Sequence, residues 1–186
     1  YHTVVIGGGC LGAATAVSLQ KKLNKLCKGE KVGLIEKAVL CAAESSRHSG
    51  IVRSANADPD ASMMASISTK MWKNIREHWG IDMELDEFGA IWIAKKNSDG
   101  DNPAWTDLSK RMEKINLVFE EIDPDSAIQK CGTTLITDKD ESYFYEPAAF
   151  QLDPSILRST LYEAIEENGV ELFEKTEVET MVATGN

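Results

Sequence analysis

Three glycines near the start of the chain have a spacing that suits phosphate binding. Gly7, Gly9 and Gly12 form the pattern Gly-x-Gly-x-x-Gly, with Cys10 and Leu11 inside it. A helix that begins in such a turn directs backbone N–H groups and the positive end of its dipole at a pyrophosphate. The first glycine permits the tight turn, the second lets the backbone approach the phosphates, and the third lets the helix pack on the strand. The pattern predicts a dinucleotide site that includes all five residues.

An acidic residue stands where the ribose of such a dinucleotide is expected. Glu36 follows Gly12 by 24 residues and comes directly after the apolar run 32–35. A carboxylate at this position accepts hydrogen bonds from the ribose hydroxyls of an adenosine, and it would repel a 2′-phosphate. The pattern therefore predicts FAD or NAD(H) as the ligand and disfavours NADP(H).

The glycines are flanked by the elements that a nucleotide-binding fold needs. Residues 3–6 are a short β-branched run, residues 13–26 carry apolar residues at helical spacing, and residues 32–35 resemble a buried strand. A strand, a helix and a parallel strand make one βαβ unit with a right-handed crossover. The sequence therefore predicts an α/β fold with a Rossmann-like nucleotide-binding domain.

The segment that follows Glu36 predicts a functional loop. Residues 37–60 are rich in Ser, Ala and Asn and show no period. The segment is too long for a passive connection in a compact domain. Long ordered loops usually serve a site.

A single amphipathic helix is predicted over residues 61–79. Apolar residues recur there every three or four positions: Met64, Ile67, Met71, Ile75 and Trp79. This spacing predicts one helix face in the core, with Gly80 as the helix end. A cluster within this stretch could line a cofactor pocket, but helical spacing favours ordinary core packing for its members Met63, Met64, Met71, Trp72 and Trp79.

The remaining elements divide the chain into three parts. Strands are predicted at 89–94, 117–122, 170–174 and 177–183, and helices at 105–115, 124–130 and 154–167. Asp123 and Asp153 suit the N-caps of the last two helices, and Gly169 suits the end of the last. We expect residues 1–80 to begin the nucleotide-binding domain, residues 81–150 to form a sheet-rich insertion, and residues 151–186 to return, incompletely, to the first domain.

The composition disfavours several classes of protein. The chain has 186 residues, 42% of them hydrophobic, which is enough for a true core. Its net charge is −10 and no stretch gathers Lys and Arg, which disfavours nucleic-acid binding. No apolar run reaches the roughly 18 residues of a membrane span. The cysteines Cys10, Cys27, Cys41 and Cys131 form no C-x-x-C pair, so we expect no metal site and a reducing interior, such as the cytoplasm or the mitochondrial matrix.

Three segments resemble a known family. VVIGGGCLGAATAVSL, then VGLIEK, then AAESSRHSGIVR are similar to the amino-acid and amine oxidase family of flavoproteins typified by D-amino-acid, glycine and sarcosine oxidases. The order of the later helices and strands agrees. The resemblance implies FAD as cofactor, an amine or amino acid as substrate, and the front half of such a protein, with residues 81–150 as part of its substrate or cap domain. It also implies that a C-terminal half or a partner chain completes the fold.

The resemblance also implies roles for individual residues. Glu36 and Lys37 would hold the adenosine ribose, and Val178 would meet the adenine. The loop residues Ser45, Ser46 and Arg47 would lie along the pyrophosphate and ribityl chain, with His48 and Ser49 near the flavin ring. Dimethylglycine and sarcosine dehydrogenases attach FAD covalently to a histidine of this loop. His48 is the candidate here, one position later than theirs when the sequences are aligned on Gly50.

Several functions stay open at this point. The first is oxidation of a carbon that bears an amine, with hydride transfer to the flavin. A second is oxidation of a 2-hydroxy acid or glycerol phosphate by a related flavoprotein. A third is an accessory subunit that keeps the flavin-binding fold without turnover. An NAD-dependent dehydrogenase shares the glycine pattern but leaves the loop AAESSRHSGIVR unexplained. Arg47 and Arg53 could each meet a phosphate or a substrate carboxylate. No catalytic residue is predicted.

Overall fold

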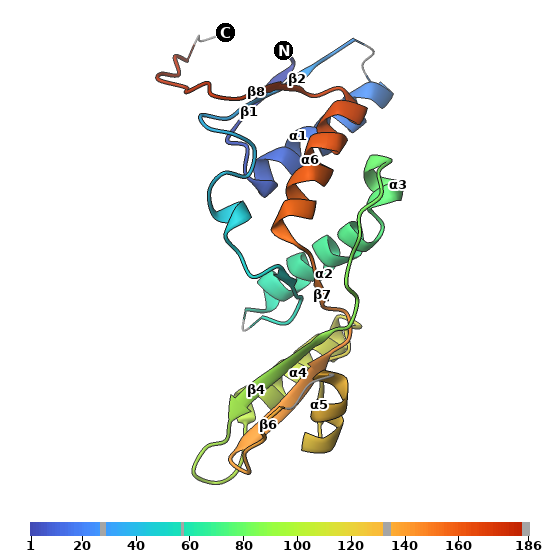
Figure 1. Cartoon of the computed structure of the whole chain (residues 1–186), viewed down its shortest axis with the longest axis vertical. Helices are drawn as coiled ribbons and strands as arrows, with labels where there is room; N and C mark the ends of the chain where they lie inside the picture. Colours follow the sequence, from blue (N-terminus) through green and yellow to red (C-terminus); the bar gives the residue numbers. More distant parts are fainter. Residues whose placement is uncertain (27–28, 57, 132–134, 184–186) are drawn as a thin grey trace. The chain divides into compact units, whose positions relative to one another are not determined.

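The computed structural model describes residues 1–26, 29–56, 58–131 and 135–183 (Figure 1). The chain divides into two compact units. Unit 1 comprises residues 1–50, 74–84 and 153–186, and unit 2 comprises residues 51–73 and 85–152. Residues 51–73 thus group with the insertion, whereas the sequence interpretation placed them in the first part. Cys27 and the Gly-Asn end of the chain lie outside the described residues.

Unit 1 is built on a parallel sheet with two helices on one face (Figure 1). The strands β1 (Thr3–Ile6), β2 (Val32–Ile35) and β8 (Glu171–Phe173) lie in the order β1-β2-β8, and Thr3 is in register with Val32. The helices α1 (Cys10–Leu26) and α6 (Pro154–Asn168) pack against each other. The short helices η1 (Glu44–Ser46) and α3 (Ile75–Trp79) complete the unit. This arrangement confirms the predicted α/β class with a Rossmann-like parallel sheet.

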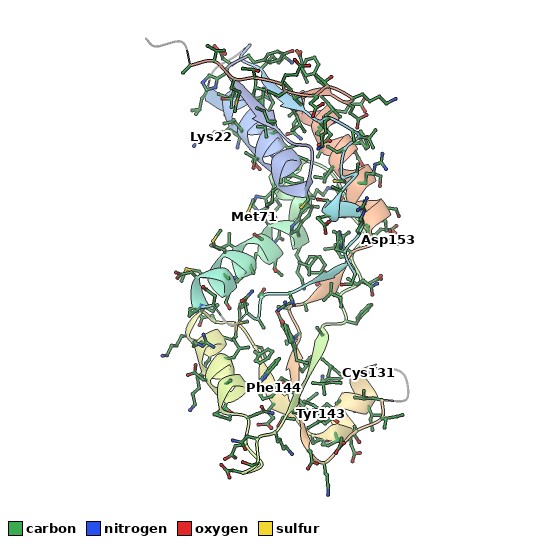
Figure 2. All side chains as sticks on the ribbon, turned by 90° about the vertical axis from the view of Figure 1, so that its left-hand side faces the viewer. Lys22, Met71, Cys131, Tyr143, Phe144 and Asp153 are labelled. Carbon is green, nitrogen blue, oxygen red and sulfur yellow. The ribbon has the colours of Figure 1, made fainter. Side chains whose placement is uncertain are left out.

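Helix α6 begins and ends as its sequence predicts. The Asp153 carboxylate, at the first turn of α6 in Figure 2, accepts a hydrogen bond of 2.7 Å from the Ser155 N–H. This bond satisfies one of the N–H groups that have no partner inside the helix. Gly169 follows the helix with φ 78°, a left-handed conformation that glycine adopts without strain. The α6 side chains Leu157 and Leu161 are buried, as the apolar face of the helix predicts.

Unit 2 contains an antiparallel sheet with an aromatic core. The strands β4 (Ala90–Lys95), β5 (Glu120–Ile122) and β6 (Glu141–Glu146) lie in the order β4-β6-β5. The helices α4 (Pro103–Lys114) and α5 (Pro124–Cys131) lie beside it, and Phe144 of β6, labelled in Figure 2, packs with Phe119. A two-stranded pair, β3 (Ile51–Val52) and β7 (Phe150–Gln151), and the helix α2 (Pro59–Lys73) complete the unit. Strands β3, β6 and β7 were not predicted.

The prediction of one helix over residues 61–79 was wrong in two respects. The helix is broken at Asn74, whose φ of −114° and ψ of 34° depart from helical values, so that α2 ends at Lys73 and α3 begins at Ile75. The face that α2 buries is also not the apolar one. Met64 is 71% exposed and Ile67 is 55% exposed.

Small polar side chains form the buried face of α2 instead. Ser62, Ser66 and Thr69 are each less than 7% exposed. The Thr69 hydroxyl lies 3.1 Å from the Ser54 hydroxyl, and the Ser62 hydroxyl donates a 3.0 Å hydrogen bond to the Asn56 carbonyl. Hydrogen bonds to the preceding loop therefore offset the burial of the Ser62 and Thr69 hydroxyls. Met71 lies on the other, exposed face (Figure 2).

The strand predicted over residues 177–183 is absent. Residues 177–183 have no regular structure and pair with no strand in the described part of the chain. No described helix is both long enough and apolar enough to cross a membrane.

Candidate functional site

The glycine turn between β1 and α1 requires glycine at two of its positions. Gly7 has φ +103°, and its N–H donates a 2.8 Å hydrogen bond to the Ile35 carbonyl at the end of β2. A Cβ atom at Gly12 would lie 1.9 Å from the Gly7 carbonyl oxygen. The turn is tight because Gly7 bends the chain and Gly12 lets helix α1 approach the Gly7 carbonyl.

The outer side of this turn is open. A Cβ atom at Gly7 would have no atom within 4 Å, and one at Gly9 would meet only the Ser45 hydroxyl at 3.3 Å. No hydrogen bond of the described residues uses the amides of Leu11 and Gly12, in the first turn of α1. The start of the helix thus presents free N–H donors beside an uncovered backbone, which is the environment that an anion prefers.

Glu36 lies against the glycine turn and is held there by backbone amides. Its Oε2 accepts a 2.7 Å hydrogen bond from the Gly8 N–H, and its Oε1 accepts one of 2.8 Å from the Ala38 N–H. Each carboxylate oxygen accepts two hydrogen bonds, so both can receive a further donor. Sequence reasoning missed the role of Gly8, where a Cβ atom would lie 2.8 Å from the Cβ of Glu36.

The loop after Glu36 returns to the same turn. The Ser45 hydroxyl accepts a 3.0 Å hydrogen bond from the Cys10 N–H at the start of α1. The Cys41 N–H donates a 2.8 Å hydrogen bond to the Gly8 carbonyl. The structure therefore brings Ser45 and Cys10 together, 35 residues apart in sequence. Nothing in the sequence pointed to Cys41, which adopts a φ of 57°.

Cys41 is a buried thiol rather than a nucleophile. Burial, with smaller contributions from the neighbouring Cys10 and Glu36 and against the opposing effect of Arg158, raises its pKa to about 11. A thiol with so high a pKa stays protonated near neutral pH and reacts slowly. Its part in the site is the backbone contact with Gly8.

A cavity of about 610 Å³ opens beside this loop in unit 1. Ser46 lines it from η1, and Ser155, Arg158 and Tyr162 line it from α6. The Tyr162 hydroxyl donates a hydrogen bond to Glu174, whose Oε1 also accepts the Leu40 N–H at 2.6 Å. Because Glu174 directly follows β8, these hydrogen bonds hold the loop at Leu40 and helix α6 at Tyr162 against the end of β8.

The other predicted loop residues are exposed. Arg47, His48, Ser49 and Lys37 make no hydrogen bond to the glycine turn in the described part of the chain. The Nδ1 atom of His48 accepts a 2.9 Å hydrogen bond from the Gly50 N–H, so Nδ1 is engaged within the loop.

Val178 is half-buried in the segment after β8. The Thr176 N–H, two residues earlier, donates a 3.0 Å hydrogen bond to the Glu36 carbonyl. This segment therefore runs past the end of β2. No group of three or more His, Cys, Asp or Glu side chains in the described ranges could hold a metal ion.

Residues 2–186 match the family DAO, described as FAD dependent oxidoreductase. The chain belongs to this family. The match confirms the resemblance that the sequence motifs predicted. Since the family is FAD-dependent, it also confirms the prediction of FAD as the family's cofactor. No match was found among curated protein sequences.

Solved structures with the DAO fold resemble the chain over nearly its whole length. Glycine oxidase from Geobacillus kaustophilus has a TM-score of 0.72 at 22% identity, over 96% of this chain and 47% of its own. L-Proline dehydrogenase from P. horikoshii has a TM-score of 0.76 at 21% identity, over 97% and 46%. L-Amino acid deaminase from Proteus myxofaciens, in complex with anthranilate, has a TM-score of 0.78 at 19% identity, over 99% and 40%. The chain therefore spans less than half the length of each.

Proposed function

We propose that unit 1 binds the adenosine and pyrophosphate parts of FAD. The observation that carries the proposal is the Glu36 carboxylate, which is fixed beside an open glycine turn with both oxygens able to accept ribose hydroxyls. Gly7, Gly9 and the first turn of α1 would face the pyrophosphate, since an anion there meets amide donors and the positive end of the helix dipole. The residues present fit the cofactor of the DAO family.

The loop and the segment after β8 would complete the cofactor site. Cys10 and Leu11 would contribute backbone amides of the turn, and Lys37 would stand beside the ribose. The loop residues Ser45, Ser46 and Arg47 would follow the pyrophosphate and ribityl chain. His48 and Ser49 would approach the flavin ring, and Val178 the adenine. The exposure of Arg47, His48 and Ser49 leaves them accessible to a ligand.

We propose oxidation of an amine or amino acid at its C–N bond as the activity of the whole protein. Structures with this fold include a glycine oxidase, an L-proline dehydrogenase and an L-amino acid deaminase, each of which acts on an amino acid. Bound FAD would supply the hydride acceptor. Unit 1 would bind and orient the cofactor, and unit 2 would form part of the substrate or cap domain. A C-terminal half or a partner chain would supply the remaining substrate contacts.

Cofactor binding is tested by titrating the apoprotein with FAD and following the quenching of flavin fluorescence. Replacing Glu36 by Gln removes the negative charge from the acceptor of the two proposed hydrogen bonds from the ribose hydroxyls. We therefore expect the affinity for FAD to be about 10- to 100-fold weaker. Glu44→Gln is the matched control, because Glu44 is an exposed acid of the same loop. Equal affinities of the wild type and Glu36→Gln would refute the placement of the ribose.

The activity is tested by adding amino acids to the flavin-loaded protein without oxygen. Loss of the visible flavin absorption with an amino acid, but not with a 2-hydroxy acid or glycerol phosphate, supports C–N oxidation. Tight FAD binding with no bleaching by any substrate would favour the accessory subunit. Flavin colour that stays in an acid precipitate, and is lost from the precipitate of His48→Ala, would identify His48 as a covalent attachment point.

A further inference from the structure

Unit 2 contains a polar cavity of about 410 Å³ beside the turn that follows β4, helix α4 and strand β5. The charged residues that line it are Asp101, Asp107, Lys110 and Glu121, and the neutral polar ones include Asn102 and Ser142. The volume lies in the range of ligand sites. None of these residues belongs to the glycine turn or its loop.

The floor of this cavity carries a buried hydroxyl, that of Ser142. This residue lies on β6, the middle strand of the sheet, and is 5% exposed. Phe144, labelled in Figure 2, stacks on Trp105 of α4, and side chains alternate along a strand, so Ser142 also points to the α4 side. Its hydroxyl makes no hydrogen bond in the described part of the chain. A buried hydroxyl without a partner costs free energy, so it is available to a ligand that reaches the floor.

The rim of the cavity carries three exposed carboxylates, those of Asp101, Asp107 and Glu121. Asp107 lies 3.1 Å from Nε of Arg111, which neutralises it in part. Asp101 and Glu121 form no ion pair with any described residue, and Lys110 is the cation among the lining residues. Negative charge therefore remains at the rim, on oxygens that each accept more than one hydrogen bond.

Hydrogen bonds within unit 2 fix the part of the rim that carries Asp101. Its N–H donates a 2.8 Å hydrogen bond to the side-chain oxygen of Asn97. The Asn102 side chain donates one of 3.1 Å to the carbonyl of Ala94, which is paired with Ser142 across the sheet. The acceptors are thus held in place by the protein, so a ligand does not have to order them.

We propose that this cavity receives the guanidinium group of an arginine side chain from a partner protein. A guanidinium carries a positive charge and five N–H donors in one plane, which suits a negative rim whose groups are mainly acceptors. The carboxylates of Asp101 and Glu121 would accept hydrogen bonds at the rim, and the Ser142 hydroxyl would accept one at the floor. This interaction goes beyond the proposed flavin chemistry and does not depend on it.

A side chain of a polypeptide fits this cavity because the acids are exposed whereas the hydroxyl is buried. A long side chain with its charge at the end can reach both levels while its backbone stays outside. The net charge of −10 also favours the encounter with a basic partner.

The test compares capped tripeptides, Gly-X-Gly, in which X is arginine, lysine or citrulline. Citrulline is the neutral isostere of arginine, and the capped ends remove the free amine and carboxylate of an amino-acid substrate. Two-dimensional ¹H–¹⁵N NMR of the full chain gives the affinities and the place of binding. We expect the arginine peptide to bind at least about fivefold more tightly than the other two. It should shift the amide signals of Asp101 and Ser142 and leave that of Leu161 in unit 1 unchanged.

Variants of the floor and the rim separate binding from folding. Ser142→Ala removes a hydroxyl that has no partner among the described residues, so the midpoint of urea denaturation should stay equal or rise. The same variant should bind the arginine peptide at least about threefold more weakly. Glu121→Gln should also weaken this peptide at least about threefold and leave the citrulline peptide unaffected. Glu120→Gln is the matched control, because side chains alternate along β5 and Glu120 does not line the cavity.

Four results would each overturn the proposal. Equal affinities for the arginine and lysine peptides would mean attraction by net charge alone, and equal affinities for the arginine and citrulline peptides would exclude a cationic ligand. Methylguanidinium that binds as tightly as the arginine peptide would indicate a free small molecule in place of a partner protein. No binding of the arginine peptide, or an unchanged affinity in Ser142→Ala and Glu121→Gln, would place no arginine in this cavity.

Discussion

Replacing Glu146 should destabilise unit 2 more than any single surface change. This carboxylate is 0% exposed and serves three donors from two segments. Its Oε1 accepts the Ser54 N–H at 2.5 Å and the Ala55 N–H at 3.1 Å, and its Oε2 accepts the Trp92 Nε1–H at 3.1 Å. It therefore joins the loop before α2 to β4 and β6.

The size of the effect follows from the donors that each variant leaves without an acceptor. In Glu146→Gln the amide oxygen can still serve Ser54 and Ala55, but the NH₂ group faces the Trp92 indole N–H. One buried donor without a partner costs about 1–3 kcal/mol. In Glu146→Ala all three donors lose their acceptor, so the free energy of unfolding should fall by at least about 3 kcal/mol.

Urea denaturation followed by tryptophan fluorescence measures these differences. Glu120→Gln is the matched control, because Glu120 is an exposed acid of β5 in the same sheet, and it should stay within about 0.5 kcal/mol of the wild type. If Glu146→Ala lost less than about 1 kcal/mol, or if the Gln and Ala variants were equally stable, the three hydrogen bonds would not support unit 2 as argued.

Two further predictions concern unit 1. Gly12→Ala places a methyl group 1.9 Å from the Gly7 carbonyl oxygen, where ordinary contact begins at 3.4 Å. Thermal denaturation should therefore show a free energy of unfolding that is lower by about 1–3 kcal/mol or more. Gly9→Ala is the control, because its methyl group would approach only the Ser45 hydroxyl, at 3.3 Å, and it should lose little stability. Burial raises the pKa of Glu174, but the Tyr162 hydroxyl and the backbone outweigh it and hold that pKa below its usual value. The folded pKa is thus the lower one, so the stabilisation is complete above the unfolded pKa of about 4.3 and is lost as the pH falls through the folded pKa. Melting temperatures between about pH 6 and pH 3 should fall less steeply for Glu174→Gln than for the wild type, and parallel curves would contradict this account.

The glycine turn and the caps of α6 could be predicted because each depends on residues that are close together in the sequence. Gly7 needs a positive φ, Asp153 caps the amides of its own helix, and Gly169 ends that helix. Each of these constraints acts within a few residues, so the residue type at each position carries the information. Glu36 was predictable for a related reason, since a βαβ unit sets the distance between the glycines and the end of the second strand.

Other features depend on neighbours that are far apart in sequence. The strand β6 contains the strand-forming residues Tyr143, Phe144 and Tyr145, a signal that was available but not used. No such signal marks Cys41, whose role is a hydrogen bond to the Gly8 carbonyl.

By itself, the sequence determined the parallel βαβ unit, its glycine turn and the acid that lies beside it. Only the tertiary structure decided which face of α2 is buried. The apolar period predicted Met64 and Ile67 in the core, yet the helix buries Ser62 and Thr69. The reason is that the loop 53–56 offers those hydroxyls hydrogen-bond partners, and a buried polar group with a partner costs far less than one without. The same loop, held by Glu146, sets the Arg53 guanidinium over the Trp92 ring of β4, a juxtaposition that no local pattern encodes.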